Sequence, residues 1–167
     1  GEATATARRL SDHLMPKTAA YRELLLQHPD AQPPPQQEEP LYGPTYLPRK
    51  FKIAIAVPPS NDIDVYAHDL GFVAIVENGD IVGYNVLVGG SFGVTPSAKK
   101  TFVAIAEPLC FVTPHQAIDV CTAIVKVQRD FGNRSDRKVA RLKYLLHDWG
   151  IDRFKQKVEE DYGGSLP

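Results

Sequence analysis

At the middle of the chain lies the segment Phe72-Val73-Ala74-Ile75-Val76-Glu77-Asn78-Gly79-Asp80-Ile81-Val82-Gly83-Tyr84-Asn85-Val86-Leu87-Val88. Its two apolar runs, Phe72 to Val76 and Ile81 to Val88, have the composition of β-strands. Between them stands Asn78-Gly79, and both of these residues tolerate the positive φ angles of a two-residue hairpin turn. The segment therefore predicts a pair of antiparallel strands.

Further strands are expected on both sides of this hairpin. Upstream, the apolar run from Phe51 to Val57 ends at Pro58-Pro59, and proline cannot continue the hydrogen bonding of a strand. Downstream, the residues from Thr101 to Ala106 offer another short strand.

The second half of the chain has helical periodicity. Thr113 followed by Gln116 has the form of a capping box, and Gly132 ends an apolar stripe that comprises Ala117, Val120, Cys121, Ile124, Val127 and Phe131. The stripe predicts a helix over this range, with Cys121 in the core. Ser135 is expected to cap a second helix that stops near Gly150.

Two more helical regions complete the expected elements. The last helix is expected over 152–162, and the apolar spacing over 8–26 predicts two short helical pieces separated at Pro16. Between 28 and 44 the composition turns to proline and glutamine, which predicts an exposed surface loop, with a proline-binding partner as a weaker alternative. Because strands come first and helices last, we expect an α+β fold, with a mixed, partly antiparallel sheet of about five strands packed against helices.

Length and composition limit the possible functions. The 167 residues carry a formal net charge of −1, with 43% hydrophobic and 23% charged residues, which is typical of one globular domain spanning 1–167. No apolar run approaches a membrane span and no secretory signal is evident, so we expect no membrane partner. The charge balance also argues against nucleic-acid binding. Because the chain begins at Gly1 and enters helix-like sequence quickly, we expect a piece of a longer polypeptide.

A paired-cation site is the first candidate functional site, and it occupies Leu47-Pro48-Arg49-Lys50-Phe51-Lys52. On an extended chain alternate side chains share a face, so Lys50 and Lys52 would lie side by side. The next residues on that face, Ala54 and Ala56, are small and would leave space for a bulky ligand. The alternative is two solvated lysines at an ordinary strand start.

A cationic join between two helices is the second candidate, and its sequence is Gln128-Arg129-Asp130-Phe131-Gly132-Asn133-Arg134-Ser135-Asp136-Arg137-Lys138, followed by Arg141 and Lys143. A helix start with several arginines predicts an anion cradle. Arg137 and Arg141 are four residues apart and are expected to share a helix face, from which both could bind one polyanion. The alternative is that Asp130 and Asp136 pair with these arginines at the surface.

Other motifs are weaker. Asn61-Asp62-Ile63-Asp64 lacks the full spacing of a calcium loop, and side-chain turns explain it better. The segment Gly89-Gly90-Ser91-Phe92-Gly93 is no Walker loop and instead predicts a close approach of backbone to something flat. The five histidines show no metal-ligand spacing, and two cysteines are too few for a four-thiolate cluster, so no metal ligand is expected in this chain.

Taken together, these motifs resemble one known family. The chain resembles the central α+β module of the siroheme-dependent sulfite/nitrite reductases, which carries one wall of the siroheme pocket. The resemblance rests on the order and spacing of Thr45 to Lys52, Asn61 to Asp64, Phe72 to Ile75, Gly83 to Gly90 and Gln128 to Arg134, with Ser11 to Leu14 and Asp148 to Ile151 in agreement. It covers almost all of the chain outside the proline- and glutamine-rich loop.

The resemblance implies an activity. Members of the family reduce sulfite to sulfide with six electrons at siroheme coupled to a 4Fe-4S cluster, and a flavoprotein or a ferredoxin donates the electrons. It implies a cytoplasmic location, or a plastid if the source is a photosynthetic eukaryote. Nitrite-specific members tend to carry Asn where this chain has Lys52, so sulfite is the expected substrate and nitrite the alternative. The partners implied are sulfite, the electron donor and the remaining domains of the same polypeptide.

The resemblance also implies roles for individual residues. Lys50 and Lys52 match two active-site lysines that face the anion bound on the siroheme iron. The implied cofactor-binding residues are Arg49, Asn133, Arg134, Arg137, Arg141 and Lys143, which would face the siroheme carboxylates or brace the loops that do.

Some positions depart from the family pattern. Ser91 replaces a usual glycine, Pro96 a frequent histidine, Ala104 a common arginine and Cys110 a usual glycine. The four cluster cysteines of the family are also absent from this chain. We therefore expect the chain alone to be inactive, and an isolated anion- or tetrapyrrole-binding module remains an alternative.

Overall fold

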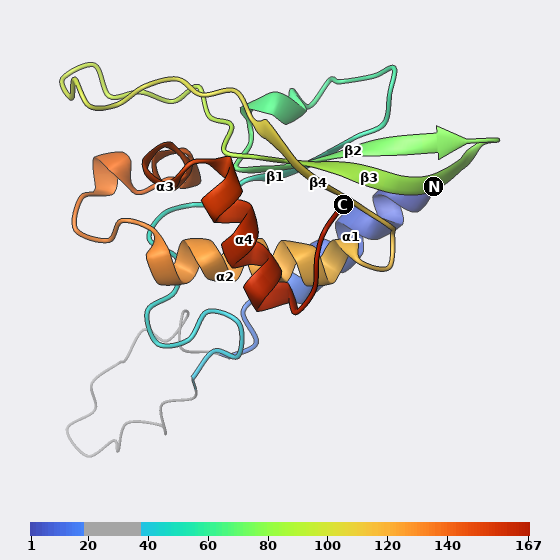
Figure 1. Cartoon of the computed structure of the whole chain (residues 1–167), viewed down its shortest axis with the longest axis horizontal. Helices are drawn as coiled ribbons and strands as arrows, with labels where there is room; N and C mark the ends of the chain where they lie inside the picture. The colour runs from blue at the N-terminus through green and yellow to red at the C-terminus, as the bar shows by residue number, and fades with distance from the viewer. Residues whose placement is uncertain (19–37) are drawn as a thin grey trace, which may run out of the picture.

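The predicted hairpin forms the middle of a mixed sheet (Figure 1). The computed structural model describes residues 1–18 and 38–167. Within these ranges the strands are β1 (Ile53–Ala56), β2 (Leu70–Glu77), β3 (Asp80–Val88) and β4 (Glu107–Val112), which lie side by side in that order. Strand β1 is parallel to β2, whereas the β2–β3 and β3–β4 pairs are antiparallel.

The turn between β2 and β3 has the predicted geometry. Asn78 has a φ of 52° and Gly79 a φ of 91°, the positive values that a tight hairpin turn requires. Glu77 pairs with Asp80 across the turn, so the antiparallel pair expected from the sequence is confirmed.

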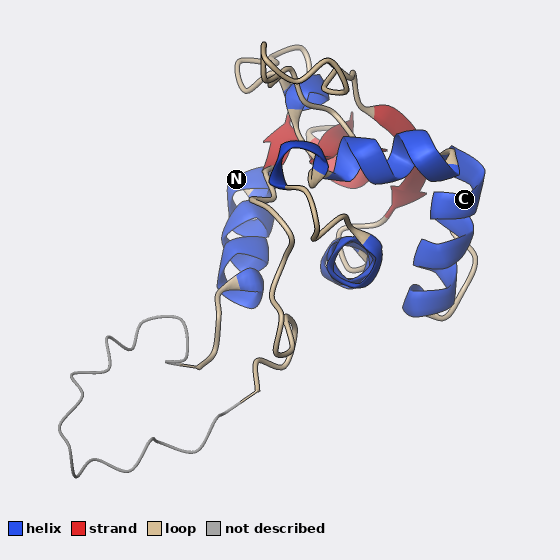
Figure 2. Cartoon of the chain, turned by 90° about the vertical axis from the view of Figure 1, so that its left-hand side faces the viewer, coloured by secondary structure: helices blue, strands red, loops and turns tan. Residues whose placement is uncertain are grey.

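The helices pack against the sheet. They are α1 (Glu2–Leu14), α2 (Ala117–Phe131), α3 (Leu142–Trp149) and α4 (Ile151–Tyr162), with short 3-10 turns η2 (Val65–Ala67) and η3 (Arg137–Val139). In Figure 1 α1, α2 and α4 lie below the sheet and η2 lies above it, and Figure 2 shows α2 end-on between α1 and α4. The α+β class with a mixed sheet packed against helices is thus confirmed.

The main core lies between the sheet and the helices. Its largest fully buried members include Phe72, Tyr84, Ile124, Leu142 and Phe154. Cys121 is fully buried among them, as the apolar stripe of α2 predicts. These side chains come from β2, β3, α2, α3 and α4, so one apolar cluster joins the sheet to the helical layer.

The other face of β1 is covered by the chain itself, contrary to the expectation from the sequence. Ala54 and Ala56 are buried in a small cluster with Val65, Leu87 and Ala106. Because the η2 segment and the residue before β4 lie on this face, the small side chains leave no space there for a bulky ligand. They allow a close approach of the loop layer instead.

One strand prediction is wrong and one strand was missed. Residues 101–106 carry an isolated bridge between Ser91 and Ala104, and Ala106 N–H donates to the Tyr66 carbonyl, so this segment crosses the η2 layer instead of joining the sheet. The true fourth strand, β4, begins at Glu107. Its Pro108 lies on the outer strand beside a register irregularity, where proline is tolerated.

The first helix begins earlier than predicted, and the break expected at Pro16 is confirmed. Helix α1 runs from Glu2 and stops at Leu14, and Met15 is extended because the residue before Pro16 is disfavoured in helical conformation. The second helical piece expected up to residue 26 lies almost entirely outside the described residues. So do residues 28–37 of the predicted proline- and glutamine-rich loop.

The helix expected from Ser135 is interrupted. Asp136, not Ser135, provides the cap, because its side chain accepts a hydrogen bond from Lys138 N–H (2.9 Å) at the start of η3. Arg141 is extended (φ −78°, ψ 159°), and α3 begins only at Leu142. Arg137 and Arg141 therefore do not share a helix face, and the prediction that they bind a polyanion from one face is wrong.

Gly90 offers a test of how tightly the loop layer covers the sheet. A Cβ at Gly90 would lie 2.1 Å from the Tyr66 carbonyl oxygen and 2.8 Å from that of His68. We expect Gly90→Ala to lower the free energy of unfolding by about 1–3 kcal/mol, because backbone must move. Urea denaturation followed by the fluorescence of the single tryptophan, Trp149, measures this.

The matched control is Gly93→Ala in the same segment. A Cβ at Gly93 would meet only Ser91 Oγ, at 3.7 Å, which is an ordinary contact. Its unfolding free energy should change by about 0.5 kcal/mol or less. Equal stabilities of the two variants would contradict the close approach at Gly90.

The two thiols give a second test. Burial raises the pKa of Cys110 to about 11 and that of Cys121 to about 12. Because the thiolate is the nucleophile, iodoacetamide at pH 8 should alkylate both cysteines far more slowly in the folded chain than in urea. Because the folded-state pKa values are raised, the neutral thiols stabilise the fold at pH values below the unfolded-state pKa. This stability is lost as the pH rises through the raised pKa values. Rapid alkylation of native Cys121, measured by mass spectrometry, would contradict its place in the core.

Candidate functional site

The lysine-containing segment leads into the sheet without belonging to it. Strand β1 begins at Ile53 and ends at Ala56, so it is shorter than the predicted 51–57, and Lys50 and Lys52 both precede it. The strand starts late because Lys52 N–H donates to the Asp69 carboxylate (2.8 Å), a side chain, whereas Lys52 C=O accepts from Leu70 N–H (3.1 Å). Both lysine side chains are exposed.

A cleft of about 480 Å³ lies beside this segment. Apolar and aromatic residues form most of its wall, together with three cations: Leu14, Pro16, Tyr42, Tyr46, Leu47, Pro48, Arg49, Lys50, Phe51, Ile53, Val125 and Arg137. Tyr42 and Tyr46 stack with their ring centroids 5.9 Å apart. Among the described residues that line it there is no carboxylate, so the cleft combines a largely apolar wall with positive charge that attracts anions.

Four of the predicted site residues have uncompensated charges. Within residues 1–18 and 38–167, the side chains of Arg49, Lys50, Lys52 and Arg137 form no hydrogen bond or ion pair. Three of them line the cleft. The structure thus brings Arg137, from η3, beside the segment that contains Arg49 and Lys50, although almost ninety residues separate them in sequence.

Arg134 has a different environment, because its guanidinium binds backbone. It donates to the carbonyl oxygens of Thr45 (2.9 Å), Tyr46 and Arg129 (2.7 Å). Gly132 adds to the same junction, since a Cβ there would lie 2.8 Å from Pro48 Cγ. The end of α2 therefore supports the loop that leads to Lys50.

Asn133 shapes the next turn. Its Oδ1 accepts hydrogen bonds from Ser135 N–H (3.0 Å), Ser135 Oγ (3.0 Å) and Asp136 N–H (2.9 Å). An Asn side chain that binds backbone two and three residues ahead is typical of a turn. In this chain Asn133 thus directs the chain from α2 into η3, which carries Arg137.

Arg141 is directed into the protein. Its Nη2 donates to Asp69 Oδ2 (2.7 Å), its Nε to Asp69 Oδ1 (3.2 Å) and its Nη1 to Ser91 Oγ (2.9 Å). The side chains of Arg141 and Asp69 are 12% and 1% exposed. The serine that departs from the family pattern therefore supplies an acceptor for the third guanidinium donor.

Lys143 is buried and holds the glycine-rich segment. Its ammonium donates to the carbonyl oxygens of Ser91 (3.3 Å), Gly93 (2.8 Å) and Phe102. Burial, with a smaller contribution from the positive charge of Arg141, lowers the pKa of Lys143. Its three acceptors are the number that an ammonium can satisfy, so this cation is fully engaged within the protein.

The two acidic residues of the cationic join do not neutralise the predicted arginines. Asp130 pairs with its neighbour Arg129 (2.7 Å), and Asp136 pairs with Lys100. The alternative that these acids pair with Arg134, Arg137 or Arg141 is therefore wrong.

The upstream acidic motif forms a side-chain turn. Asn61 Oδ1 accepts a hydrogen bond from Val65 N–H (2.9 Å), as such a turn requires.

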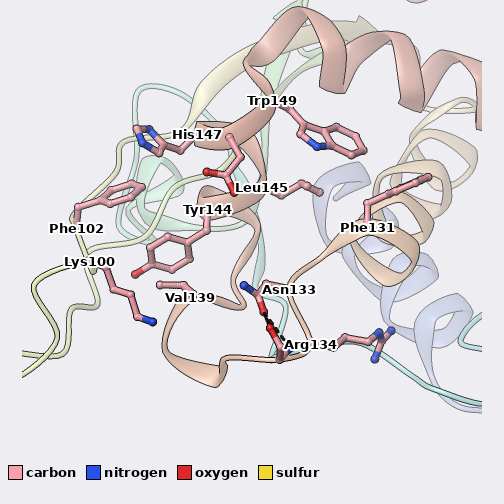
Figure 3. A pocket seen from close by; sticks show the side chains of 12 residues that line it. Lys100, Phe102, Phe131, Asn133, Arg134, Val139, Tyr144, Leu145, His147 and Trp149 are labelled. Carbon is pink, nitrogen blue, oxygen red and sulfur yellow. Dashed lines mark hydrogen bonds between the residues drawn. The ribbon is translucent and has the colours of Figure 1, made fainter.

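A second cleft, of about 750 Å³, is lined in part by residues of the 133–139 turn (Figure 3). Aromatic rings form part of its wall. The Phe102 ring centroid lies 5.0 Å from those of Tyr144 and His147, and the centroids of Phe131 and Trp149 are 5.1 Å apart. Sequence reasoning did not find this cleft. Its residues come from the 100–102 loop, the end of α2, the 133–139 turn and α3, and only Asn133 and Arg134 among them were predicted site residues.

No metal site is formed by the described residues. They contain no group of three or more His, Cys, Asp or Glu side chains that could hold a metal ion. The whole chain has two cysteines, one on β4 and one inside α2, so it cannot supply the four thiolates of a 4Fe-4S cluster. Among the helices of the described part, none is long and apolar enough to cross a membrane.

Several known proteins are similar to this chain in sequence. The curated relatives include the "Sulfite reductase (NADPH) hemoprotein beta-component" of Geobacillus thermodenitrificans, 50% identical over 163 residues, and that of Bacillus subtilis, 48% identical over 161 residues. Both matches cover 96% of this chain, and the chain spans 28% of the length of each relative.

A solved structure and a family profile complete the comparison. The structure of the Mycobacterium tuberculosis NirA protein is similar with a TM-score of 0.61 at 31% identity, over 74% of this chain and 22% of that one. The profile of the family described as "Nitrite and sulphite reductase 4Fe-4S domain" matches residues 5–166. Members of this family depend on siroheme and a 4Fe-4S cluster. With its match over nearly the whole sequence, the chain belongs to the nitrite and sulfite reductase family.

Proposed function

We propose that this chain is the part of a sulfite reductase that presents cations to siroheme and to its bound substrate. The observation that carries the proposal is the cleft beside Arg49, Lys50 and Arg137, whose charges no carboxylate of the described wall neutralises. Sulfite and the acidic edge of siroheme are both anions, so such a surface attracts both. Relatives named as sulfite reductase hemoproteins at about half identity support the substrate.

The cation set fits siroheme at its edge. Arg49 and Arg137 have the forked donors that suit carboxylates, and the stacked rings of Tyr42 and Tyr46 lie in the same wall. When bound, siroheme supplies an iron that holds the substrate and passes electrons to it. The 4Fe-4S cluster does not fit this chain, because its only cysteines are the buried Cys121 and the partly exposed Cys110, both with raised pKa values. Its ligands must come from elsewhere in the intact protein.

The lysines have the chemistry that the reaction needs. Hydrogen sulfite, six electrons and six protons give hydrosulfide and three waters, so every oxygen that leaves must be protonated. Lys50 and Lys52 would attract the anion, stabilise its charge and donate protons at their Nζ atoms. The names of the relatives contain NADPH, and the electrons would reach this site through a flavoprotein or a ferredoxin.

The remaining predicted cofactor residues act by support in this proposal. Arg134 holds the loop before Lys50, Asn133 directs the turn to Arg137, and Arg141 and Lys143 hold the strand start and the glycine-rich segment. The terminal guanidinium nitrogens of Arg134 and Arg141, the ammonium of Lys143 and the side-chain oxygen of Asn133 are already engaged within the chain. We therefore assign direct contact with siroheme or substrate to Arg49, Lys50, Lys52 and Arg137.

Two other functions are separated by simple measurements. Nitrite reduction is the alternative within the family, and the ratio of kcat/KM for sulfite and nitrite in the intact enzyme decides between them. An inactive tetrapyrrole- or anion-binding module is the alternative outside enzyme function. Siroheme absorbance together with sulfide production in the intact polypeptide excludes that alternative, and a complete protein without heme excludes the enzyme.

The bacterial relatives favour a cytoplasmic location.

The lysines provide the main test. Lys50→Met and Lys52→Met each remove an ammonium and keep an apolar stem of similar length. In the intact enzyme each change should lower the rate of sulfite reduction by at least about tenfold, because a donor to the reacting anion is lost. Siroheme content, measured by visible absorbance, should stay nearly unchanged.

The matched control is Lys155→Met on α4, a partly exposed lysine outside the cleft. It should leave both turnover and siroheme content unchanged. Parallel loss of heme and activity in the Lys50 or Lys52 variants would indicate a folding role and would overturn the assignment.

The two arginines provide a separate test that does not require turnover. Arg49→Gln and Arg137→Gln should each weaken siroheme retention by at least about tenfold, because a charge-assisted hydrogen bond to a carboxylate is lost. The measurement is siroheme per polypeptide after dialysis at increasing salt. Arg153→Gln on α4 is the control, since the Arg153 guanidinium lies outside the cleft and 4.5 Å from the centroid of the Trp149 ring. Retention equal to that of the control would remove Arg49 and Arg137 from the cofactor site.

A further inference from the structure

One buried carboxylate joins four segments of the chain at the lysine site. Asp69 Oδ2 accepts from Lys52 N–H (2.8 Å) and from Arg141 Nη2 (2.7 Å), while Oδ1 accepts from Arg141 Nε (3.2 Å). The backbone carbonyl of Asp69 accepts from Gly89 N–H (2.9 Å). The ends of β1, β2 and β3 nearest the lysines and the residue before α3 are therefore connected through one residue.

The ion pair between Asp69 and Arg141 is unlike the other ion pairs of the described residues. Asp69 and Arg141 are 1% and 12% exposed, whereas every other pair has both side chains at least 21% exposed. Exposed pairs contribute little to stability, and a buried pair has to offset the desolvation of two charges. A fully hydrogen-bonded buried pair does, however, define one geometry, because each alternative arrangement leaves a charge without a partner.

The geometry that this pair defines is the main-chain position of Lys52. Its N–H is held by the carboxylate and its C=O by Leu70, so the Cα of Lys52 is fixed while its side chain extends into solvent. A lysine stem is long and flexible, and a fixed base restricts the volume that the ammonium can sample. Arg141 in turn fixes the carboxylate by a two-point contact and is itself held by Ser91 Oγ.

We propose that Asp69 and Arg141 are positioning residues that set the place from which Lys52 meets the substrate anion. This proposal rests on the proposed function, in which Lys52 faces sulfite. Neither residue touches substrate or cofactor in it, and both act through the backbone of Lys52. Misplacement of a reacting group by about 1 Å is enough to slow an enzyme by up to about a hundredfold.

The test is a double-mutant cycle in the intact enzyme. Asp69→Asn keeps the size and one acceptor of the side chain but loses the charge that Arg141 requires. We expect it to lower kcat for sulfite by about 10-fold to 100-fold, with siroheme content retained. In a Lys52→Met background the same change should have almost no further effect on kcat, because the group that it positions is gone. In a Lys155→Met background the full effect should remain.

Each other outcome contradicts the proposal. If Asp69→Asn leaves kcat unchanged, or if its effect on kcat is the same with and without Lys52, then the pair has a structural role only. If Lys52→Met itself leaves turnover unchanged, the role of Lys52 in the proposed function is wrong, and the positioning role is wrong with it. A normal kcat in Lys52→Met therefore contradicts the proposed function. An equal loss of kcat on Asp69→Asn with and without Lys52 contradicts only the positioning role of the Asp69–Arg141 pair.

A second variant covers poor folding of Asp69→Asn. Arg141→Lys keeps a positive charge beside Asp69 but loses the two-point contact and the bond to Ser91 Oγ. It should show the same dependence on Lys52, with a smaller loss of kcat. Independence from Lys52 in this variant would also overturn the proposal.

Discussion

A single buried carboxylate, that of Asp69, connects the sheet to the surface that bears the candidate site. It holds the start of β1 through Lys52 N–H and the start of α3 through Arg141, and its own carbonyl binds Gly89 at the end of β3. Removal of one partner from a buried pair generally costs about 3–5 kcal/mol, because the other charge remains buried and unpaired. The arrangement therefore favours a fixed geometry at this edge of the sheet.

The cations of the chain fall into two groups that sequence alone does not separate. Arg134, Arg141 and Lys143 bind carbonyl oxygens or a buried carboxylate, so their charge is used to hold loops together. Arg49 and Arg137 line an apolar cleft and have no such partner among the described residues. An arginine or lysine that is already engaged by the protein has few donors left for a ligand. Hence the second group is the better choice for contact with siroheme.

The sequence predicts the elements that depend on local signals. The Asn78-Gly79 turn, the stripe of α2 with Cys121 in the core and the helix that ends at Tyr162 are all present in the structure. The family resemblance, carried by motif spacing, is confirmed as well. Local signals fail where contacts with residues distant in sequence determine the structure of a segment. Residues 101–106 look like a strand, yet they bind Ser91 and Tyr66 across the η2 layer instead of the sheet.

The candidate site shows the same limit. Its residue types are visible in the sequence, but the side-chain partners that divide them into two groups are not. Nothing near Arg141 in the sequence indicates a bond to Asp69, since the two residues are 72 positions apart. The break between η3 and α3, which separates Arg137 from Arg141, likewise has no proline or glycine to mark it. Contacts of this kind arise only from the tertiary fold.

In the proposed enzyme, exposure of the lysines explains why the cation wall needs an opposite wall. Two unit charges 4 Å apart attract by about 1 kcal/mol in bulk water and by about 4 kcal/mol near a protein surface. Lys50 and Lys52 are exposed in this chain, so water and salt would weaken their attraction for sulfite. The chain spans 28% of the length of its relatives, and in the proposal the rest of the protein covers this face. Exclusion of water by that cover would strengthen the attraction of the same ammonium groups for sulfite without any change in their other contacts.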